Sequence, residues 1–318
     1  MSVIAVDFGG TRCKAGVVAG GVAREVRVLE TPGHGSLERM LPALREWCAG
    51  VAAAGGEPVE ALVWALPCVI APGGCSVVRT FGKFDDAPGL DLAGWARETL
   101  GLPLVLENDA RAAVLGEWQG GAGRGCDHLV MVTLGTGIGT AVVSGGRPLR
   151  GANGVAGILG AHSVAAGGGR ACVCGLSGCA ESEAGSWALP AIARESPRFG
   201  GSALAREAVV DYRAVFRHAA AGDRLAIELR ERALAVWERL LVALVQQFDP
   251  QRVVLGGGVM AAGDEILPRL QERLDGDAAT RGIRVELRRA ELGDAAALVG
   301  CGWLWASRDG REDGGRTA

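Results

Sequence analysis

The sequence lacks the features that mark several large classes of protein. It has no stretch of about eighteen uninterrupted apolar residues, so it predicts no membrane-spanning helix. Its first residues, MSVIAVDFGGT, contain no signal-peptide pattern and are typical of a first β-strand. Its 33 Lys and Arg balance 36 Asp and Glu without a basic run, so we expect no nucleic acid or membrane partner. We therefore expect a cytoplasmic protein. Its 318 residues are enough for two domains that share a cleft.

The nine cysteines are an odd number in a chain without an export signal, so we expect no disulfide framework. Six of them lie among apolar or small residues and are expected to be buried or half-buried thiols: Cys13, Cys48, Cys68, Cys75, Cys126 and Cys301. The other three, Cys172, Cys174 and Cys179, lie close together, and His162 precedes them by ten residues. Three thiolates and one imidazole fill a tetrahedral Zn²⁺ site and leave no position for a reactive water. The spacing therefore predicts a structural zinc, with unliganded thiols as the alternative.

The apolar periodicity predicts an α/β chain in which one arrangement occurs twice. A strand over 2–8 is followed by a Gly/Thr-rich turn and a second strand over 14–18. The same order recurs where strands over 128–134 and 140–143 flank Gly135-Thr-Gly-Ile-Gly139. This weak duplication predicts two related α/β domains. Further strands are expected at 22–29, 61–66, 104–106 and 253–255, and helices at 37–51, 92–100, 110–118, 234–248 and 294–306.

Both Gly/Thr-rich turns suit phosphate binding, because glycine allows close backbone approach and threonine adds a hydroxyl donor. Asp7, just before the first turn, is placed to hold Mg²⁺ directly or through water. Neither turn is a P-loop, and the second joins strand to strand, whereas the dinucleotide fingerprint opens a helix. For either turn alone, a tight hairpin without a ligand is the alternative. The candidate residues are Gly9, Gly10, Thr11, Arg12, Gly135, Thr136 and Gly137.

Two further stretches end predicted strands with groups that carry chemistry. Glu107-Asn108-Asp109 offers a carboxylate of the kind that accepts the hydroxyl proton in alcohol phosphorylation. The alternative is that Asp109 only caps the helix that follows. Gly256, Gly257 and Gly258 end another strand, where bare backbone would let an adenine or ribose lie close. A simple strand-to-loop turn is the alternative there.

Taken together, these stretches resemble the ROK family of bacterial sugar kinases and repressors, in order and over nearly the whole chain. Asp7-Phe-Gly-Gly-Thr11 and Gly135-Thr-Gly-Ile-Gly-Thr140 resemble its two phosphate motifs, and Glu107-Asn-Asp109 resembles its catalytic segment. Cys172-x-Cys174-Gly-x-x-Gly-Cys179-x-Glu181 resembles its zinc signature, and Leu255-Gly-Gly-Gly258 its adenosine loop.

The resemblance implies a two-domain actin-like, ribonuclease-H-like kinase fold with an interdomain cleft, using ATP, Mg²⁺ and a structural zinc, often as a homodimer. It implies a small domain over 1–118 plus 293–318, onto which the last helix packs, and a large domain over 119–292 with the zinc site. The resemblance also implies that Asp109 is the general base. The residues it implies at the sugar are Asn108, Asp109, His162 and Glu181.

Two observations refine this expectation. The first strand begins at residue 2, so no helix-turn-helix of the family's repressors fits ahead of it, which favours a kinase. Many members also have a sugar-binding Glu in a Glu-x-Gly-His stretch, but here Ile158 or Leu159 takes the Glu place before His162. A lost carboxylate removes a contact of about 1.5–3 kcal/mol. We expect phosphorylation of glucose at the 6-position, with fructose, allose, N-acetylglucosamine or N-acetylmannosamine as alternative substrates. The missing Glu leaves a catalytically weak sugar-binding regulator as the alternative class.

Overall fold

The computed structural model describes residues 1–9, 12–31, 35–53, 58–163, 167–276 and 282–308. They form two compact units, and each is built on a five-stranded sheet. The first unit comprises Met1–Gly125, Pro148–Ala156 and Glu291–Ala318, and the second Cys126–Arg147 and Gly157–Ala290. Gly10 and Thr11, two of the candidate phosphate residues, lie outside the described residues.

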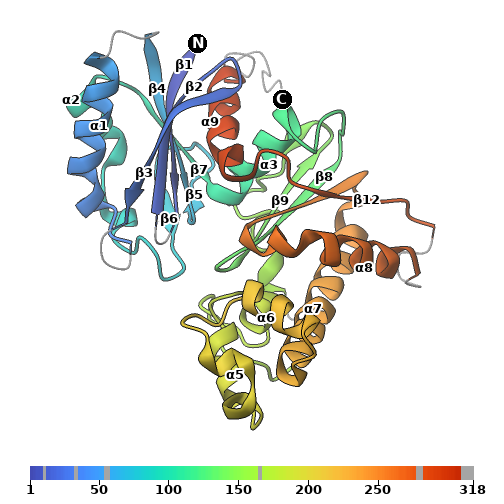
Figure 1. Ribbon diagram of the computed structural model, residues 1–318. Helices are drawn as coiled ribbons and strands as arrows, with labels where there is room; N and C mark the ends of the chain where they lie inside the picture. Colours follow the sequence, from blue (N-terminus) through green and yellow to red (C-terminus); the bar gives the residue numbers. More distant parts are fainter. Residues whose placement is uncertain (10–11, 32–34, 54–57, 164–166, 277–281, 309–318) are drawn as a thin grey trace. The chain divides into compact units, whose positions relative to one another are not determined.

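The first sheet has the strand order β3-β2-β1-β4-β7 (Figure 1). Its central strand β1 pairs antiparallel with β2 and parallel with β4, so Asp7 lies opposite Lys14 on one side and Ala65 on the other. A short ribbon of β5 and β6 lies between β4 and α2 in the chain. The bounds are β1 Ser2–Phe8, β2 Arg12–Ala19, β3 Val22–Glu30, β4 Val59–Leu66, β5 Val69–Ile70, β6 Val77–Arg79 and β7 Leu104–Asn108.

The second sheet repeats the first, with the order β10-β9-β8-β11-β12. Its central strand β8 pairs antiparallel with β9 and parallel with β11, as β1 does with β2 and β4. The repeat of strand, Gly/Thr-rich turn and strand that the sequence predicts is therefore confirmed. The bounds are β8 Leu129–Leu134, β9 Ile138–Ser144, β10 Arg147–Pro148, β11 Arg252–Gly256 and β12 Glu286–Arg289.

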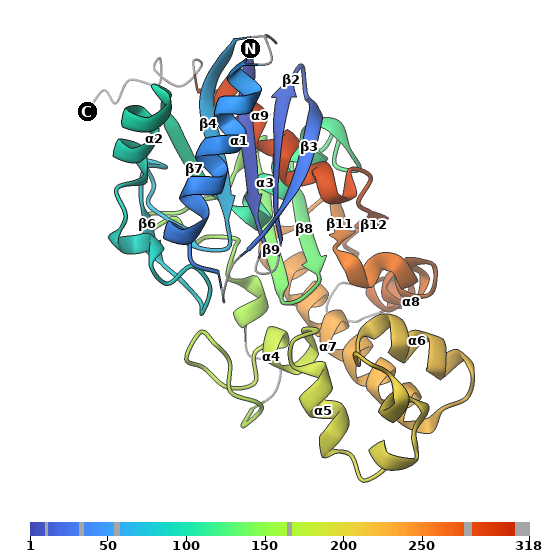
Figure 2. The same ribbon diagram turned by 60° about the vertical axis from the view of Figure 1, so that its left-hand side comes forward.

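Helices cover both faces of the first sheet (Figures 1 and 2). On one face lie α1 (Leu41–Ala53) and α2 (Leu92–Leu100), above a core in which Phe8 packs edge-on against Trp64 at 5.2 Å between ring centroids. Asp91 caps α2 by accepting a hydrogen bond from the Gly94 amide at 2.8 Å. On the other face lie α3 (Asp109–Gly120) and α9 (Ala296–Ala306), so the end of the chain returns to the first unit.

The helices α3 and α9 approach so closely that only glycine fits at their contact. A Cβ added to Gly116 would lie 1.9 Å from the Ala296 carbonyl oxygen, and one added to Gly300 would lie 1.8 Å from that of Ala112. Because α3 begins at Asp109, this contact fixes the helix whose first turn carries the candidate general base.

The second unit is mainly helical around α7, which packs against α4, α6 and α8. The Tyr212 hydroxyl and the Trp237 indole N–H both donate to the Ala184 carbonyl, at 3.1 and 3.3 Å, and fix the end of α4. None of the described helices is both long and apolar enough to cross a membrane. The bounds are α4 Ala180–Ala184, α5 Leu189–Glu195, α6 Tyr212–Ala220, α7 Arg224–Phe248 and α8 Gly263–Gly276.

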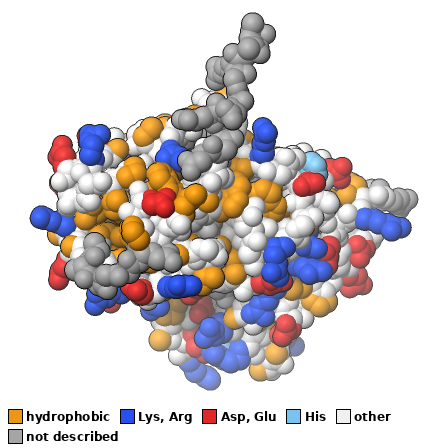
Figure 3. Space-filling model, turned by 90° about the horizontal axis from the view of Figure 1, so that it is seen from above, with side chains coloured by type: hydrophobic (Ala, Val, Ile, Leu, Met, Phe, Trp, Pro, Cys, Tyr) orange, Lys and Arg blue, Asp and Glu red, His pale blue; other side chains and the backbone are white. Residues whose placement is uncertain are grey.

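Two surface features bear on the sequence predictions. On the face seen in Figure 3, Lys and Arg side chains are interspersed with Asp and Glu, so this face presents no extended area of one charge. Of the six scattered cysteines, five are buried, but the prediction is wrong for Cys75, which is exposed. The reason is its position between β5 and β6, where a turn of small residues provides no side chain large enough to cover it.

Replacing Gly300 with Ala should destabilise the protein, since the added methyl group can fit only if α3 and α9 move apart. Overpacking of this kind lowers the free energy of unfolding by about 1–3 kcal/mol, measured in urea. Gly50→Ala in α1 is the matched control, because no described atom lies within 4 Å of the added Cβ. That variant should gain roughly 0.5–1 kcal/mol from helix propensity. Equal changes in the two variants would contradict the close contact.

Candidate active site and metal centre

The candidate catalytic segment lies where β7 passes into α3. The Asn108 side-chain oxygen accepts a hydrogen bond from the Arg111 amide at 3.1 Å, so Asn108 is the N-cap of α3. The alternative that Asp109 is the cap is therefore wrong. The Asn108 side-chain amide donates to the Asp109 Oδ1 atom at 3.1 Å and to the Cys68 carbonyl at 3.2 Å. Asp109 Oδ1 also accepts from the Ala110 amide at 2.8 Å, so two donors fix this carboxylate.

Glu107, the first residue of this segment, belongs to a buried cluster of one carboxylate and two guanidinium groups. Glu107 is only 3% exposed, and its Oε1 atom lies 2.7 Å from Nη1 of Arg111, which is 1% exposed. Its Oε2 atom lies 2.5 Å from Nη2 of Arg150, which is partly exposed. Burial by itself raises the pKa of Glu107, but Arg111 and Arg150 outweigh it and hold that pKa below its ordinary value. Glu107 is therefore an anion in the folded protein.

Arg111 also anchors the chain segment that follows β10. Its Nε atom donates to the Leu149 carbonyl at 3.1 Å, and its Nη2 atom donates to the carbonyls of Gly154 and Ala156 at 2.9 and 3.1 Å. This role of Arg111 was not predicted from the sequence. The available signal was the spacing of four residues between Glu107 and Arg111, which is typical of ion pairs near a helix.

Asp7 is the second-last residue of β1 and lies within the same unit as Asp109. Burial and, to a smaller extent, the negative charge of Asp109 raise the pKa of Asp7 to about 7, although Lys14 opposes both. A carboxylate whose ionisation is disfavoured by a second carboxylate forms with it a donor set that fits Mg²⁺, because a hard divalent cation neutralises negative charge and prefers oxygen ligands. The charges of Asp7 and Asp109, the two candidate carboxylates, therefore interact in the folded protein.

The first candidate phosphate turn requires glycine at its start. The Gly9 amide donates to the Arg12 carbonyl at 2.9 Å, and a Cβ on Gly9 would lie 2.5 Å from that oxygen. Arg12 begins β2 and is exposed. Thr31 donates its hydroxyl to the Gly9 carbonyl at 3.1 Å, which ties β3 to the turn.

The second candidate turn joins β8 to β9 and is supported by Glu181 from α4. Within the turn, the Gly135 amide donates to the Gly137 carbonyl at 3.0 Å. Glu181 Oε2 accepts from the Ile138 amide at 3.1 Å and would lie 2.7 Å from a Cβ on Gly137. The Thr136 carbonyl accepts from the Trp187 amide at 2.9 Å. Glu181 therefore holds the hairpin, a contact that the sequence analysis did not predict.

The glycine loop after β11 lies against the same hairpin strand. Gly257 has a φ of 88°, and a Cβ there would lie 2.3 Å from the Leu134 carbonyl oxygen. Gly256 ends β11 and Gly258 begins the short turn that follows. In the second unit, the structure thus brings together the hairpin and the glycine loop, both of which the sequence analysis assigned to the nucleotide.

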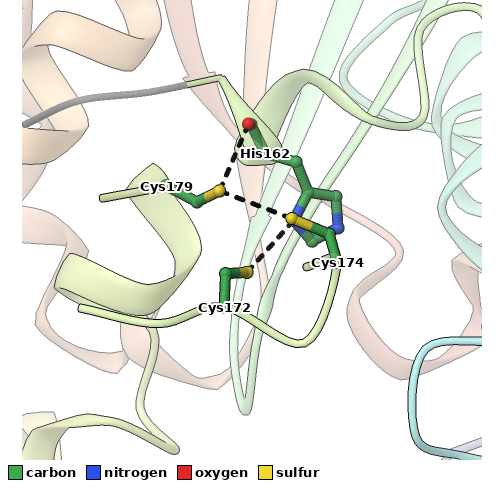
Figure 4. Close-up of side chains that lie close together, drawn as sticks. All are labelled: His162, Cys172, Cys174 and Cys179. Atoms are coloured by element: carbon green, nitrogen blue, oxygen red, sulfur yellow. Dashed lines mark hydrogen bonds between the residues drawn. The ribbon is translucent and has the colours of Figure 1, made fainter. Parts of the chain in front are cut away.

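The predicted metal ligands converge on one point (Figure 4). One ligand atom from each of His162, Cys172, Cys174 and Cys179 lies within 4.8 Å of all the others. With Zn–S bonds of about 2.3 Å, four ligand atoms at such separations fit around a single tetrahedral ion. The donor set, three thiols and one imidazole, is also the set that zinc prefers.

Two side chains of α4 hold the loop that carries these ligands. The Ser182 hydroxyl donates to the Arg170 carbonyl at 3.0 Å, and Glu183 accepts from the Arg170 amide at 2.7 Å. Glu183 also pairs with Arg232 of α7. Cys179 is the N-cap residue of α4, so the metal ligands lie at the start of the helix that positions Glu181.

Several known proteins are similar to this chain in fold and in sequence. A crystal structure of a ROK family glucokinase from Streptomyces griseus, in complex with glucose and AMPPNP, matches with a TM-score of 0.79 and 30% identity, covering 96% of this chain and 99% of that one. The N-acetylmannosamine kinase of Escherichia fergusonii is 31% identical over 307 residues, 96% of this chain and 98% of that protein. The glucokinase of Halalkalibacterium halodurans is 35% identical over 209 residues, 64% of this chain and 63% of that protein.

The fold and these similarities define a two-domain, actin-like sugar kinase. The ROK family model matches residues 3–308, and the chain belongs to the ROK family. The resemblance inferred from the motifs is thereby confirmed.

The raised pKa of Asp7 predicts a pH-dependent penalty on stability. Because the folded-state pKa lies above the ordinary value of 3.8, Asp7 favours folding below that value, and this contribution is lost as pH rises toward 7. Asp7→Asn removes the penalty, so its gain in the free energy of unfolding should be about 1–3 kcal/mol larger at pH 8 than at pH 5. Urea unfolding at the two pH values, without added Mg²⁺, measures this difference.

The exposed residue Asp264 provides the control, since Asp264→Asn should behave alike at both pH values. If Asp7→Asn gained the same amount at pH 5 as at pH 8, the charge of Asp7 would not be the source of the penalty.

Proposed function

We propose that this sugar kinase uses ATP to phosphorylate the 6-hydroxyl of glucose, with Asp109 as general base. The observation that carries the proposal is the Asp109 carboxylate, fixed by Asn108 and Ala110 at the start of α3 and coupled electrostatically to Asp7. The likeness to a glucokinase described in complex with glucose and AMPPNP supports the choice of substrates.

The proposed reaction requires little covalent chemistry from the protein itself. Asp109 accepts the proton of the sugar hydroxyl while its oxygen bonds to the γ-phosphorus and the bond to the β-phosphate oxygen breaks. General base catalysis of this kind contributes about 10²–10⁴ in rate. Asn108 holds one carboxylate oxygen of Asp109, which fixes its orientation before the substrate arrives.

The glycine-rich turns and Asp7 serve the nucleotide in this proposal. Backbone N–H groups of the turns at Gly9–Thr11 and Gly135–Gly137 would stabilise the charge on the phosphate oxygens, with Arg12 nearby in the chain. Asp7 would hold Mg²⁺, which when bound neutralises charge on the phosphates. Gly256, Gly257 and Gly258 would accommodate the adenosine.

The sugar contacts would come from Asn108, Asp109, His162 and Glu181. The Glu that many family members have before His162 is replaced by an apolar residue, and both candidates at that place, Ile158 and Leu159, are apolar. Ile158 is buried. Selectivity among sugars must therefore come from the remaining contacts. An N-acetylmannosamine kinase shares 31% identity with the chain, so N-acetylmannosamine is the second candidate substrate.

We further propose that His162, Cys172, Cys174 and Cys179 hold a structural Zn²⁺. All four positions are filled by protein, so the ion would stabilise the loop rather than activate a water. Since Cys179 precedes Glu181 by two residues at the start of α4, the ion would fix the helix that supports the second hairpin.

Asp109→Asn should lower kcat by about 10²–10⁴-fold while sugar affinity, measured by calorimetry, changes little, because the amide keeps the shape but does not accept the proton. The assay is ADP release with Mg-ATP against glucose, fructose, allose, N-acetylglucosamine and N-acetylmannosamine. Asp264→Asn, at an exposed position, is the control and should keep full activity.

Full activity of Asp109→Asn would rule out the mechanism. Turnover by the wild-type protein only on another sugar would reassign the substrate. Sugar binding without turnover on any sugar would establish the regulator in place of the kinase.

Cys174→Ser should release the metal, because it removes one of four ligands at a closed site. Mass spectrometry of the purified wild-type protein should find about one zinc per chain, and the variant should lose both zinc and several degrees of Tm. Cys75→Ser is the matched control, since Cys75 is exposed and lies outside the cluster. An unchanged zinc content in Cys174→Ser would contradict the assignment.

A further inference from the structure

A small cavity lies inside the first unit, next to the candidate catalytic segment. Its walls include the turn after β5, at Ala71–Gly74, and the end of α9, at Leu304. Glu107 and Arg111 also line it, and Arg150 and Arg308 complete its lining. The turn is fixed against β7, because the Leu106 amide donates to the Gly74 carbonyl at 2.8 Å. The cavity is therefore built on the same strand that delivers Asn108.

The lining carries an excess of positive charge. It contains three guanidinium groups against one carboxylate, that of Glu107, and no other Asp or Glu contributes. Glu107 is already compensated, since both its oxygens bond to arginines. The remaining cationic charge in a partly enclosed space attracts an anion.

The arginines differ in what they can still donate. Arg111 is committed to Glu107 and to three carbonyl groups. Among the described residues, Arg150 has only the bond from Nη2 to Glu107, and the Arg308 guanidinium forms no ion pair and lies over the Trp305 ring at 5.9 Å. Arg150 and Arg308 therefore retain the N–H donors that bind phosphate oxygens best.

The size of the cavity limits the ligand. Its volume of about 60 Å³ holds roughly four to six water-sized groups, at about 10–15 Å³ each. A phosphate group has five heavy atoms and matches this number. We propose that the cavity is an anion site that takes one phosphate group, either inorganic phosphate or the phosphate of an ester, between Arg150 and Arg308.

The site would adjoin Asn108 and Asp109, neither of which lines the cavity. Glu107, which shares Arg150 with the proposed anion, also accepts a hydrogen bond from the Asn108 amide at 3.0 Å. The inference does not depend on the proposed function, because it concerns the binding of an anion and not the transfer of a phosphoryl group.

Calorimetric titration with inorganic phosphate, at ionic strength held constant with chloride, tests the proposal. We expect wild-type protein to bind phosphate, and Arg308→Gln and Arg150→Gln to bind it at least about tenfold more weakly, as expected for a lost charge-assisted hydrogen bond. Arg124→Gln is the matched control: Arg124 is an exposed arginine of the same unit, and the change alters net charge equally. Glucose 6-phosphate in a second arm distinguishes an ester from the free ion.

Thr136→Ala separates this site from the candidate nucleotide turn. Phosphate binding that is lost in Arg308→Gln but kept in Arg124→Gln and Thr136→Ala supports the proposal. Binding that survives Arg308→Gln, binding lost only in Thr136→Ala, equal losses in Arg124→Gln, or no binding by the wild-type protein would each overturn it. Circular dichroism confirms that each variant is folded before titration.

Discussion

A single buried ion pair, between Glu107 and Arg111, is the constraint on which the first unit depends. A carboxylate that is 3% exposed destabilises the fold unless a fixed positive charge lies against it. Arg111 supplies that charge at 2.7 Å and uses its other donors on the carbonyls of Leu149, Gly154 and Ala156. One side chain thereby joins β7, α3 and the segment after β10. The residues next to this pair in the sequence are Asn108 and Asp109, so the ion pair also helps to fix the position of the proposed general base, Asp109.

In the second unit, another glutamate connects separate secondary-structure elements. Glu181 accepts from the Ile138 amide and so connects α4 to the hairpin between β8 and β9. The cluster of His162 and three cysteines holds the start of α4, and Ala184 at its end accepts from Tyr212 and Trp237. A short helix of five residues has little intrinsic stability, so these contacts at both ends are what keep it in place. In each unit, then, a buried or half-buried carboxylate supports a candidate functional segment: Glu107 the start of α3, and Glu181 the hairpin between β8 and β9.

The sequence could predict what depends on local patterns. The strands β1, β4, β7, β8 and β11 follow from their apolar runs, and the repeated hairpins follow from Gly/Thr-rich turns between such runs. The four metal ligands could be predicted because three of them lie within eight residues and the fourth is close by.

Residues whose positions depend on distant partners could not be predicted from the sequence. Arg111 has partners 38 to 45 residues away, and the contact between Gly116 and α9 joins two helices that lie far apart in the sequence. Asn108, rather than Asp109, became the helix cap because the Asn108 side chain reaches the Arg111 amide. The apolar and small neighbours of Cys75 in the sequence predict a buried or half-buried thiol, but their small size leaves it exposed.

The most direct test of this account is a double-mutant cycle on the buried pair, with the free energy of unfolding measured in urea for Glu107→Gln, Arg111→Met and the double variant. We predict that each single change lowers stability by about 3–5 kcal/mol, because each leaves the partner charge buried and unpaired. The double variant should then be at least about 2 kcal/mol more stable than the sum of the single losses implies. Additive losses would contradict the account, because they would mean that Glu107 and Arg111 stabilise the first unit independently.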